Sequence, residues 1–512
     1  MAEPLPSVLF TDAADAALPA AGEPSFFGDL NLDQVVRDLT AGRKDHDLAP
    51  FFHTPIRTLE TVAHRQAVFR DLEDPDLVAG VAAFGSRMRE ARQQLRQAHR
   101  LHHPYQRESW FLDAVGTYCR AVGEVAEVLD RGDLRSAGMA AVRDHVAAYR
   151  SGDRFRGLSE ATGSLATRLS EVRYSLHITP GRVRVSGGLE QVDYGAHVVG
   201  VFEKFSQGEP TDHRVPYRSD IAMNHVEEAV LDRVARLFPD VFAELDAYCE
   251  RYGDFLDPTV EAFDREVQFY LAYLEYIAPL KAAGLAFCRP EVDDTSKEVL
   301  GRDVFDIALA AKLVRARAPV VPNDFELSGP ERVIVVSGPN QGGKTTFARA
   351  FGQLHHLAAL GCPVPGSRAR LFLCDQLFTH FERGENLTDL SGKLYDDLVR
   401  TRDILAQATP SSVVVMNEVF TSTTLRDAVL LGTRTLESVI EHDLLCVCVT
   451  FVDELASLGP STVSMVSTVV PDDPARRTYR VVREPPGGIT HALAIAEKYH
   501  LTYRQLKERL SS

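Results

Sequence analysis

One short motif constrains the fold of this chain more than any other feature of its sequence. Residues 338–345 read Gly-Pro-Asn-Gln-Gly-Gly-Lys-Thr and satisfy the pattern G-x-x-x-x-G-K-[ST] at every position. A β-branched run precedes the motif at residues 333–336, and a helix-forming run follows it at residues 346–360. A strand, a glycine-rich loop and a helix in this order form a phosphate-binding loop. The pattern therefore predicts an α/β domain that binds a nucleotide.

The residues of this loop have separate tasks in the predicted site. The glycines let backbone N–H groups close around the β-phosphate, and the following helix presents its positive N-terminal end. We expect Lys344 to reach the β- and γ-phosphates and the Thr345 hydroxyl to ligate Mg²⁺, so the predicted cofactors are ATP and Mg²⁺. The predicted nucleotide-binding residues of the loop are Gly338, Pro339, Asn340, Gln341, Gly342, Gly343, Lys344, Thr345 and Thr346.

A second motif lies downstream, where an apolar strand that begins at Ser412 ends in Asn417 and Glu418. The carboxyl end of such a strand is where a sheet with a phosphate-binding loop places its metal and water chemistry. Asn417 brings a neutral amide to the metal position, which normally holds an aspartate. Glu418 is the candidate general base for the attacking water, with Lys344 as the other catalytic residue. The alternative interpretation of Glu418 is a surface carboxylate.

The chain divides by its periodicity into two long parts. Residues 26–290 carry apolar residues three and four apart and predict a helical domain, with a small β-hairpin near residues 175–205. Residues 291–512 alternate β-rich runs with helices and predict an α/β domain. Residues 1–25 are rich in Ala, Pro and acidic residues and predict a flexible tail. The predicted fold class is therefore α + α/β.

Composition excludes several classes of protein. Lys plus Arg number 56 against 72 Asp plus Glu, a net charge of −16, so any nucleic-acid contact must come from a local basic patch. The 7 cysteines form no Cys-x-x-Cys pair, which favours a reducing compartment. No apolar run approaches the about 18–20 residues of a membrane span, and the N-terminus lacks a signal-peptide pattern. We expect a cytoplasmic protein without a membrane partner.

Two basic clusters are candidates for contact with DNA phosphates. Arg92, Arg96 and Arg100 recur every four residues on one predicted helix face. Arg182 and Arg184 lie on one strand face of the predicted hairpin. The alternatives are a solvated helix for the first cluster and a plain solvent-exposed hairpin for the second.

These motifs resemble those of the MutS family of DNA mismatch-repair ATPases. The loop GPNQGGKTT, with Asn340 and its paired glycines, is similar to the family's version, and residues 417–424 resemble its Walker B and D-loop region. The stretch at residues 55–72 resembles the family's core and lever helices. The resemblance implies a core and lever-like domain over 26–290 and a P-loop ATPase domain of ABC/MutS type over 291–512. It also implies a shortened protein that lacks the mismatch-reading domain.

The resemblance further implies an assembly and an activity. In the family, two ATPase domains dimerise and each site is completed by the partner. By position, Ser391 and Gly392 are the residues expected to reach the other subunit's nucleotide, and the alternative for them is a solvated helix start. The expected function is a slow ATPase that couples ATP-dependent homodimerisation to DNA binding in mismatch repair or a related DNA transaction. The alternative is a nucleotide-gated protein switch or scaffold without DNA binding.

Three departures from the family pattern limit this transfer. Asn417 replaces the Walker B aspartate, Phe451 stands where the family usually has a histidine beside the γ-phosphate, and Leu394 stands near the usual serine of the trans-acting segment. These changes predict weak ATPase activity, whereas binding should survive because the loop and Lys344 are intact. For Phe451, burial in the core at a strand end is preferred over contact with the nucleotide.

Overall fold

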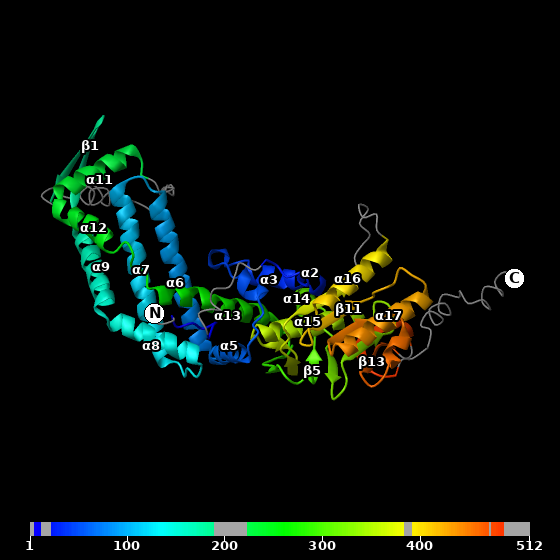
Figure 1. The fold of residues 1–512 in the computed structure, drawn as a ribbon. Coiled ribbons are helices and arrows are strands. Elements are labelled where there is room, and N and C mark those ends of the chain that lie inside the picture. Colours follow the sequence, from blue (N-terminus) through cyan, green and yellow to red (C-terminus); the bar gives the residue numbers. More distant parts are fainter. Residues whose placement is uncertain (1–4, 12–21, 189–222, 383–391, 471–472, 486–512) are drawn as a thin grey trace, which may run out of the picture. The chain divides into compact units, whose positions relative to one another are not determined.

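The computed structural model describes residues 5–11, 22–188, 223–382, 392–470 and 473–485 (Figure 1). The chain forms two compact units. The first unit combines Met1–Asp74, Leu134–Ala140 and Arg265–Ser512, and the second combines Pro75–Asp133 and Ala141–Asp264. The helical stretch predicted over residues 26–290 thus contributes to both units. Helices dominate the second unit and the first contains helices with mixed sheets, which confirms the α + α/β class.

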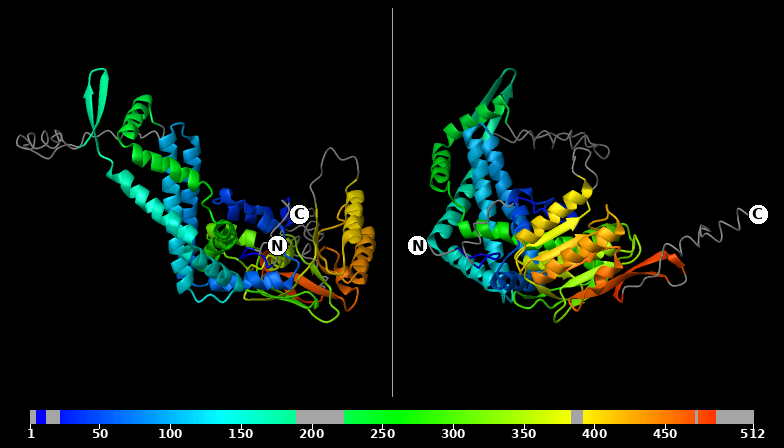
Figure 2. Two further views of the ribbon diagram at one scale, coloured as in Figure 1. Left: turned by 60° about the vertical axis from the view of Figure 1, so that its left-hand side comes forward. Right: turned by 45° about the vertical axis from the view of Figure 1, so that its right-hand side comes forward.

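Long amphipathic helices build the second unit, because their apolar residues recur on one face and pack together. A hairpin of strands β1 and β2 follows α9, with His177 opposite Arg184 and Ile178 opposite Val183 (Figure 2). The rest of the predicted hairpin region, from residue 189, lies outside the described residues up to residue 222. The elements are α6 (Pro75–Arg100), α7 (Pro104–Arg131), α9 (Asp153–Glu171), β1 (Tyr174–Thr179), β2 (Arg182–Gly187), α11 (His225–Leu237) and α12 (Pro239–Arg251). Two helices, α8 (Ala137–Ser151) and α13 (Pro258–Ala282), have residues in both units.

Arg92, one residue of the candidate basic stripe on α6, is paired with a carboxylate in the structure. Its guanidinium donates to the fully buried carboxylate of Asp264 on α13, so its charge is compensated inside the second unit. Arg96 and Arg100 remain exposed. The spacing of the three arginines predicted a shared helix face correctly, but it carried no information about a partner 172 residues away.

A six-stranded sheet forms the centre of the first unit, in the order β10-β11-β12-β7-β13-β14. Its strands pair in parallel except for β13 and β14, which are antiparallel. Strands β7, β11 and β12 are buried at every position, as expected for parallel strands covered on both faces. The strands are β7 (Val333–Ser337), β10 (Leu377–Phe381), β11 (Val413–Asn417), β12 (Leu445–Val449), β13 (Thr462–Val470) and β14 (Asp473–Arg483).

Further elements surround this sheet. A four-stranded sheet has the order β4-β9-β5-β6, and β3 pairs with β8. These strands are β3 (Phe287–Cys288), β4 (Glu291–Asp293), β5 (Val299–Val304), β6 (Asn323–Leu327), β8 (Val364–Pro365) and β9 (Arg368–Phe372). The helices are α2 (Phe27–Leu30), α3 (Leu32–Thr40), η1 (Lys44–His46), α4 (Ala49–His53), α5 (Leu59–Asp71), α14 (Ile307–Arg315), α15 (Lys344–Ala359), α16 (Lys393–Gln407), α17 (Leu425–Glu441) and η2 (Asp453–Ser457).

Helix α15 is buried along most of its length, including its polar side chains. The Gln353 amide donates to the Leu30 carbonyl at 2.8 Å and to the Asp306 carboxylate at 2.9 Å. The ring of His356 hydrogen-bonds the Phe52 carbonyl at 2.9 Å, and that of His355 the Phe351 carbonyl at 2.8 Å. Burial lowers the pKa of both histidines to about 4, so both are neutral at physiological pH.

Val8, Leu9 and Phe10 belong to the core of the first unit, which corrects the prediction of a flexible tail over residues 1–25 for this stretch. The carboxylate of Glu266 accepts a hydrogen bond from the Leu9 N–H at 3.3 Å and bonds from two further donors of the segment. The buried guanidinium of Arg65 donates to the Leu9 carbonyl at 2.9 Å. The composition of the segment gave no sign of these partners, because both lie far along the chain.

Two expectations concern the environment of the protein. Among the described helices, none combines the length and the apolar character required to cross a bilayer. All 7 cysteines are free thiols, in agreement with the absence of a disulfide framework.

We predict that His356 makes the stability of the first unit depend on pH. Because its pKa is about 4 in the folded chain and near 6.5 when unfolded, the unfolded chain binds more protons between these values. The free energy of unfolding should therefore fall as pH falls from about 6.5 to 4, by up to about 1.4 kcal/mol per pH unit for this residue. Urea denaturation at several pH values should show a shallower slope for His356→Gln than for the unmutated chain. The exposed His442, changed to Gln, is the control and should leave the slope unaltered.

Candidate nucleotide-binding site

The loop between β7 and α15 has the backbone geometry that its glycines allow. Gly338 and Gly343 have φ values of +113° and +93°, which side chains other than glycine rarely adopt. A Cβ atom on Gly338 would lie 2.6 Å from Ser467 Oγ, and one on Gly342 would lie 2.4 Å from the same atom. The loop therefore packs closely on β13, and glycine is required at both positions.

Lys344 is folded back onto the loop. Its Nζ donates to the Gly338 carbonyl at 2.9 Å, the Pro339 carbonyl at 3.3 Å and the Asn340 side-chain oxygen at 3.3 Å. The residue is only 4% exposed, and burial lowers its pKa although Glu418 Oε1 lies 3.9 Å away. The ammonium group is therefore held among the oxygen atoms of the loop.

The end of β11 brings the second motif to the loop. The Thr345 hydroxyl donates to Asn417 Oδ1 at 2.8 Å, so the two residues predicted to bind a metal are adjacent. Glu418 has a φ of +53°, and its N–H donates to the Val449 carbonyl at 2.9 Å. This left-handed turn at the end of the strand directs the half-exposed Glu418 side chain towards Lys344.

The β13–β14 hairpin supplies residues that the sequence analysis missed. Arg477 Nε donates to the Asn340 carbonyl at 3.1 Å, which places a second cation beside the loop. The backbone of Tyr479, with a φ of +60°, lies against Gly343 and accepts a hydrogen bond from the Asn323 side chain at 3.2 Å. An open groove at this hairpin is lined mainly by apolar side chains: Val320, Val321, Pro322, Thr468, Val469, Thr478, Arg480 and Val482.

The predicted trans-acting segment is described only in part. Ser391 lies outside the described residues. Gly392 is the exposed N-cap of α16, with extended backbone angles, and Leu394 packs against the core below the sheet. The preferred interpretation of Phe451 as a core residue is wrong, because its side chain is 48% exposed. The N–H of the preceding Thr450 bonds to Val336, so the chain leaves the sheet just before Phe451.

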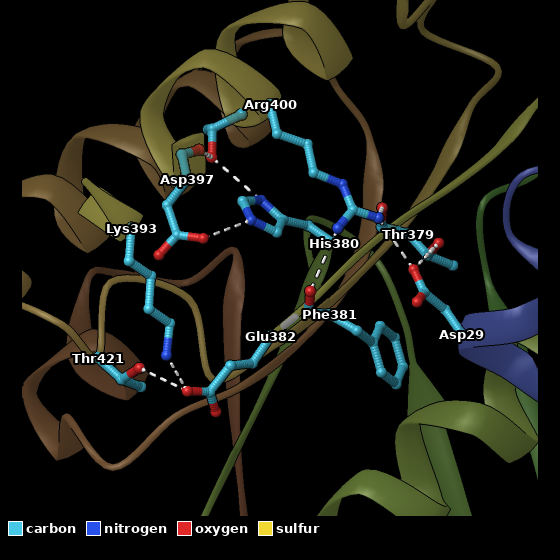
Figure 3. A network of polar contacts seen from close by, with 10 residues as sticks. Asp29, Thr379, His380, Phe381, Glu382, Lys393, Asp397, Arg400 and Thr421 are labelled. Carbon is cyan, nitrogen blue, oxygen red and sulfur yellow. Dashed lines mark hydrogen bonds and ion pairs between the residues drawn. The ribbon is translucent and has the colours of Figure 1, made fainter. Parts of the chain in front are cut away.

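A polar network fastens the strand before this segment to the helix after it (Figure 3). Arg400 on α16 donates to the Asp29 carboxylate at 2.9 Å and to the Thr379 carbonyl at 2.8 Å. The His380 ring bonds the Asp397 carboxylate at 3.1 Å. In addition, the Glu382 carboxylate accepts from Lys393 and, at 3.4 Å, from Thr421. The network thus links β10 and α16 to the loop that follows Glu418.

The sequence of this region matches a known family. The family model described as MutS domain V matches residues 334–479, which include the loop, Asn417 and most of the β13–β14 hairpin. Residues 334–479 are thus similar to MutS domain V. The resemblance predicted from the motifs is thereby confirmed.

The MutS relationship extends to individual curated proteins. The chain is 35% identical over 191 residues to the DNA mismatch repair protein MutS of Erythrobacter litoralis, a match that covers 36% of this chain and 22% of that protein. It is 30% identical over 176 residues to MutS of Chlamydia pneumoniae, covering 34% and 21% of the two chains. It is 27% identical over 207 residues to the DNA mismatch repair protein Msh3 of Mus musculus, covering 40% and 18%. The matched segments thus span about a fifth of the length of these relatives.

Proposed function

We propose that this chain is a MutS-like ATP-binding protein with slow ATPase activity, which couples ATP-dependent homodimerisation to DNA binding in mismatch repair or a related DNA transaction. The observation that carries the proposal is the arrangement around the loop. Lys344 lies inside it, Thr345 is hydrogen-bonded to Asn417, and Glu418 lies 3.9 Å from the lysine. Slow phosphoryl transfer to water is the chemistry this arrangement supports best.

Nucleotide binding requires an exchange of hydrogen bonds at Lys344. Oxygens of the β- and γ-phosphates would replace the loop oxygens as acceptors of the Lys344 ammonium. The N–H groups at the start of α15 would face the same phosphates.

The oxygen ligands available for Mg²⁺ fit this ion, but they are uncharged. Thr345 and Asn417 offer a hydroxyl and an amide oxygen, and Mg²⁺ binds oxygen ligands together with nucleotide phosphates and water. When bound, Mg²⁺ would neutralise charge on the phosphates. Because no aspartate is present at position 417, binding of Mg²⁺ to the site would depend mainly on the nucleotide phosphates. For this reason we propose that ATP hydrolysis is slow. Glu418 is the carboxylate proposed to accept the proton of the attacking water.

We predict that Lys344→Ala abolishes ATP binding and that Glu418→Gln keeps binding but loses hydrolysis. The lysine holds the charge at the centre of the loop, whereas Glu418 is needed only for the proton transfer. Calorimetry with ATP and a phosphate-release assay measure the two effects. Asn417→Asp is expected to raise turnover by restoring an anionic metal ligand. Unchanged ATP affinity of Lys344→Ala, or full hydrolysis by Glu418→Gln, would contradict the assigned roles.

Dimerisation is proposed through the face formed by α16 and α17. These neighbouring helices carry exposed apolar side chains, including Tyr395 at 63% and Leu425 at 59% exposure. Both residues are close in sequence to segments that the family resemblance assigns to the site, namely Gly392 and the Thr421–Thr424 loop. Exposed apolar side chains near a charged site are a common feature of protein interfaces.

We predict that Glu418→Gln dimerises in ATP and Mg²⁺ and that Leu425→Asp prevents this. A carboxylate at a buried apolar contact lacks a partner, so the dimer should weaken by at least about 10-fold. Light scattering at micromolar concentration measures the mass. Ile178→Asp, at another exposed apolar position, is the matched control and should still dimerise. A chain that remains monomeric in saturating ATP would contradict the proposed assembly.

DNA contact is proposed at the β1–β2 hairpin. Residues 172–188 contain three arginines and a histidine but no carboxylate, in a chain whose net charge is −16. The pairing of His177 with Arg184 and of Thr179 with Arg182 places these cationic side chains on one face, and both arginines are exposed. A local cationic face on an acidic protein is suited to the phosphates of a duplex.

We predict that Arg182→Ala combined with Arg184→Ala weakens DNA binding at all sequences. For each arginine that binds a phosphate, its removal should reduce the slope of log affinity against log salt by about 0.9. Fluorescence anisotropy with labelled duplexes at several salt concentrations measures this slope. The double control Arg143→Ala with Arg156→Ala removes the same charge elsewhere in the second unit and should change the slope little. If the unmutated chain binds ATP but no DNA, the nucleotide-gated switch without a DNA role becomes the better proposal. The ion pair of Arg92 with Asp264 favours this alternative for the arginines of α6, because it already compensates one of their charges.

A further inference from the structure

Ser467 on β13 is a buried serine whose hydroxyl has no hydrogen-bond partner among the described residues. The side chain is fully buried, so its hydroxyl is also shielded from water. An unpaired buried hydroxyl destabilises a fold, and the few that persist in native structures call for an explanation.

The hydroxyl lies directly against the nucleotide loop. Cβ atoms built on Gly338 and Gly342 would come within 2.6 Å and 2.4 Å of Ser467 Oγ, so the serine touches both glycines. The backbone carbonyls of this part of the loop are the acceptors that surround Lys344. The unpaired donor therefore lies against the loop that carries those acceptors.

Those carbonyls already have a donor. Lys344 Nζ donates to the Gly338 carbonyl at 2.9 Å and to the Pro339 carbonyl at 3.3 Å. The charged ammonium is the side-chain donor that these carbonyls have in this structure, and charge-assisted bonds of this kind are strong. In the same structure the Ser467 hydroxyl has no partner among the described residues.

We propose that Ser467 is a positioning residue of the nucleotide loop, whose hydroxyl donates to a loop carbonyl that Lys344 releases when a nucleoside triphosphate binds. This inference rests on the proposed nucleotide binding and goes beyond it by assigning the hydrogen bond that replaces the lysine. The released carbonyl would otherwise be buried without a donor, which would oppose binding. The exchange satisfies both groups in the occupied state.

The position of β14 keeps the loop in place during this exchange. Arg477 Nε donates to the Asn340 carbonyl at 3.1 Å, and that bond does not involve Lys344. The hairpin therefore stays attached to the middle of the loop while the lysine moves. A shift of the loop towards β13 would then bring an acceptor to the Ser467 hydroxyl.

Ser467→Ala provides the test, and Ser464→Ala on the same strand provides the matched control. The Ser464 hydroxyl is also buried without a partner among the described residues, but it lies on the opposite face of β13, because side chains alternate along a strand. Calorimetry gives the affinity for ATP, and thermal unfolding without nucleotide gives the stability of each variant.

We expect Ser467→Ala to bind ATP about 3- to 10-fold more weakly, as for the loss of one hydrogen bond formed in the bound state. The same variant should melt about 2–4 °C higher without nucleotide, because an unpaired hydroxyl has been removed. Ser464→Ala should also melt slightly higher but bind ATP with unchanged affinity. A purely structural serine would not produce these opposite effects on binding and stability.

Two results would overturn the inference. One is ATP affinity of Ser467→Ala equal to that of the unmutated chain, and the other is a lower melting temperature for the nucleotide-free variant, which would mean that the hydroxyl already has a partner. The failure of the proposed function is distinguishable from both, since in that case the unmutated chain itself would not bind ATP.

Discussion

The burial of α15 is the constraint on which the first unit depends. A helix enclosed on most sides must satisfy its polar groups internally, and Gln353 and His356 do so through bonds to α2, α4 and the start of α14. These bonds fix the position of the helix axis. Its N-terminus, where four N–H groups lack helical acceptors, is therefore held at the edge of the central sheet. The loop proposed to bind phosphate is the segment that connects this end to β7.

The same constraint explains the chemistry of the loop. Because β7, β11 and β12 end together at this edge, Thr345 meets Asn417 and the turn at Glu418 faces the lysine. The groups nearest Lys344 are mostly neutral oxygens, and Glu418 stands a little farther away. A site of this kind is suited to holding a phosphate chain firmly and is less well equipped to accelerate its cleavage. Retention and release of nucleotide would then matter more than rate.

Local patterns in the sequence predicted the parts of the fold that depend on near neighbours. The strand, loop and helix around residues 333–360 have the predicted order, since the glycines and the β-branched run specify each piece locally. What the sequence did not reveal are contacts between distant segments. Ser467 and Arg477 approach the loop through an antiparallel hairpin that carries no motif. Phe451 was assigned to the core because aromatic residues are usually buried, but the chain turns out of the sheet at Thr450.

The packing of residues 7–10 has a consequence for synthesis of the chain on the ribosome. Their partners Glu266 and Tyr270 come more than 250 residues later in the sequence. At about 5–20 residues per second, this segment waits roughly 15–50 s before it finds them. The apolar residues of α2, which pack on α15, wait longer still. Both segments of the second unit, by contrast, lie between the N-terminal and C-terminal parts of the first unit in the sequence. The last residue of the second unit is Asp264, so its whole sequence has been synthesised when Asp264 emerges. The vectorial order of synthesis thus favours folding of the second unit first, while the N-terminal apolar segments of the first unit remain exposed to chaperones.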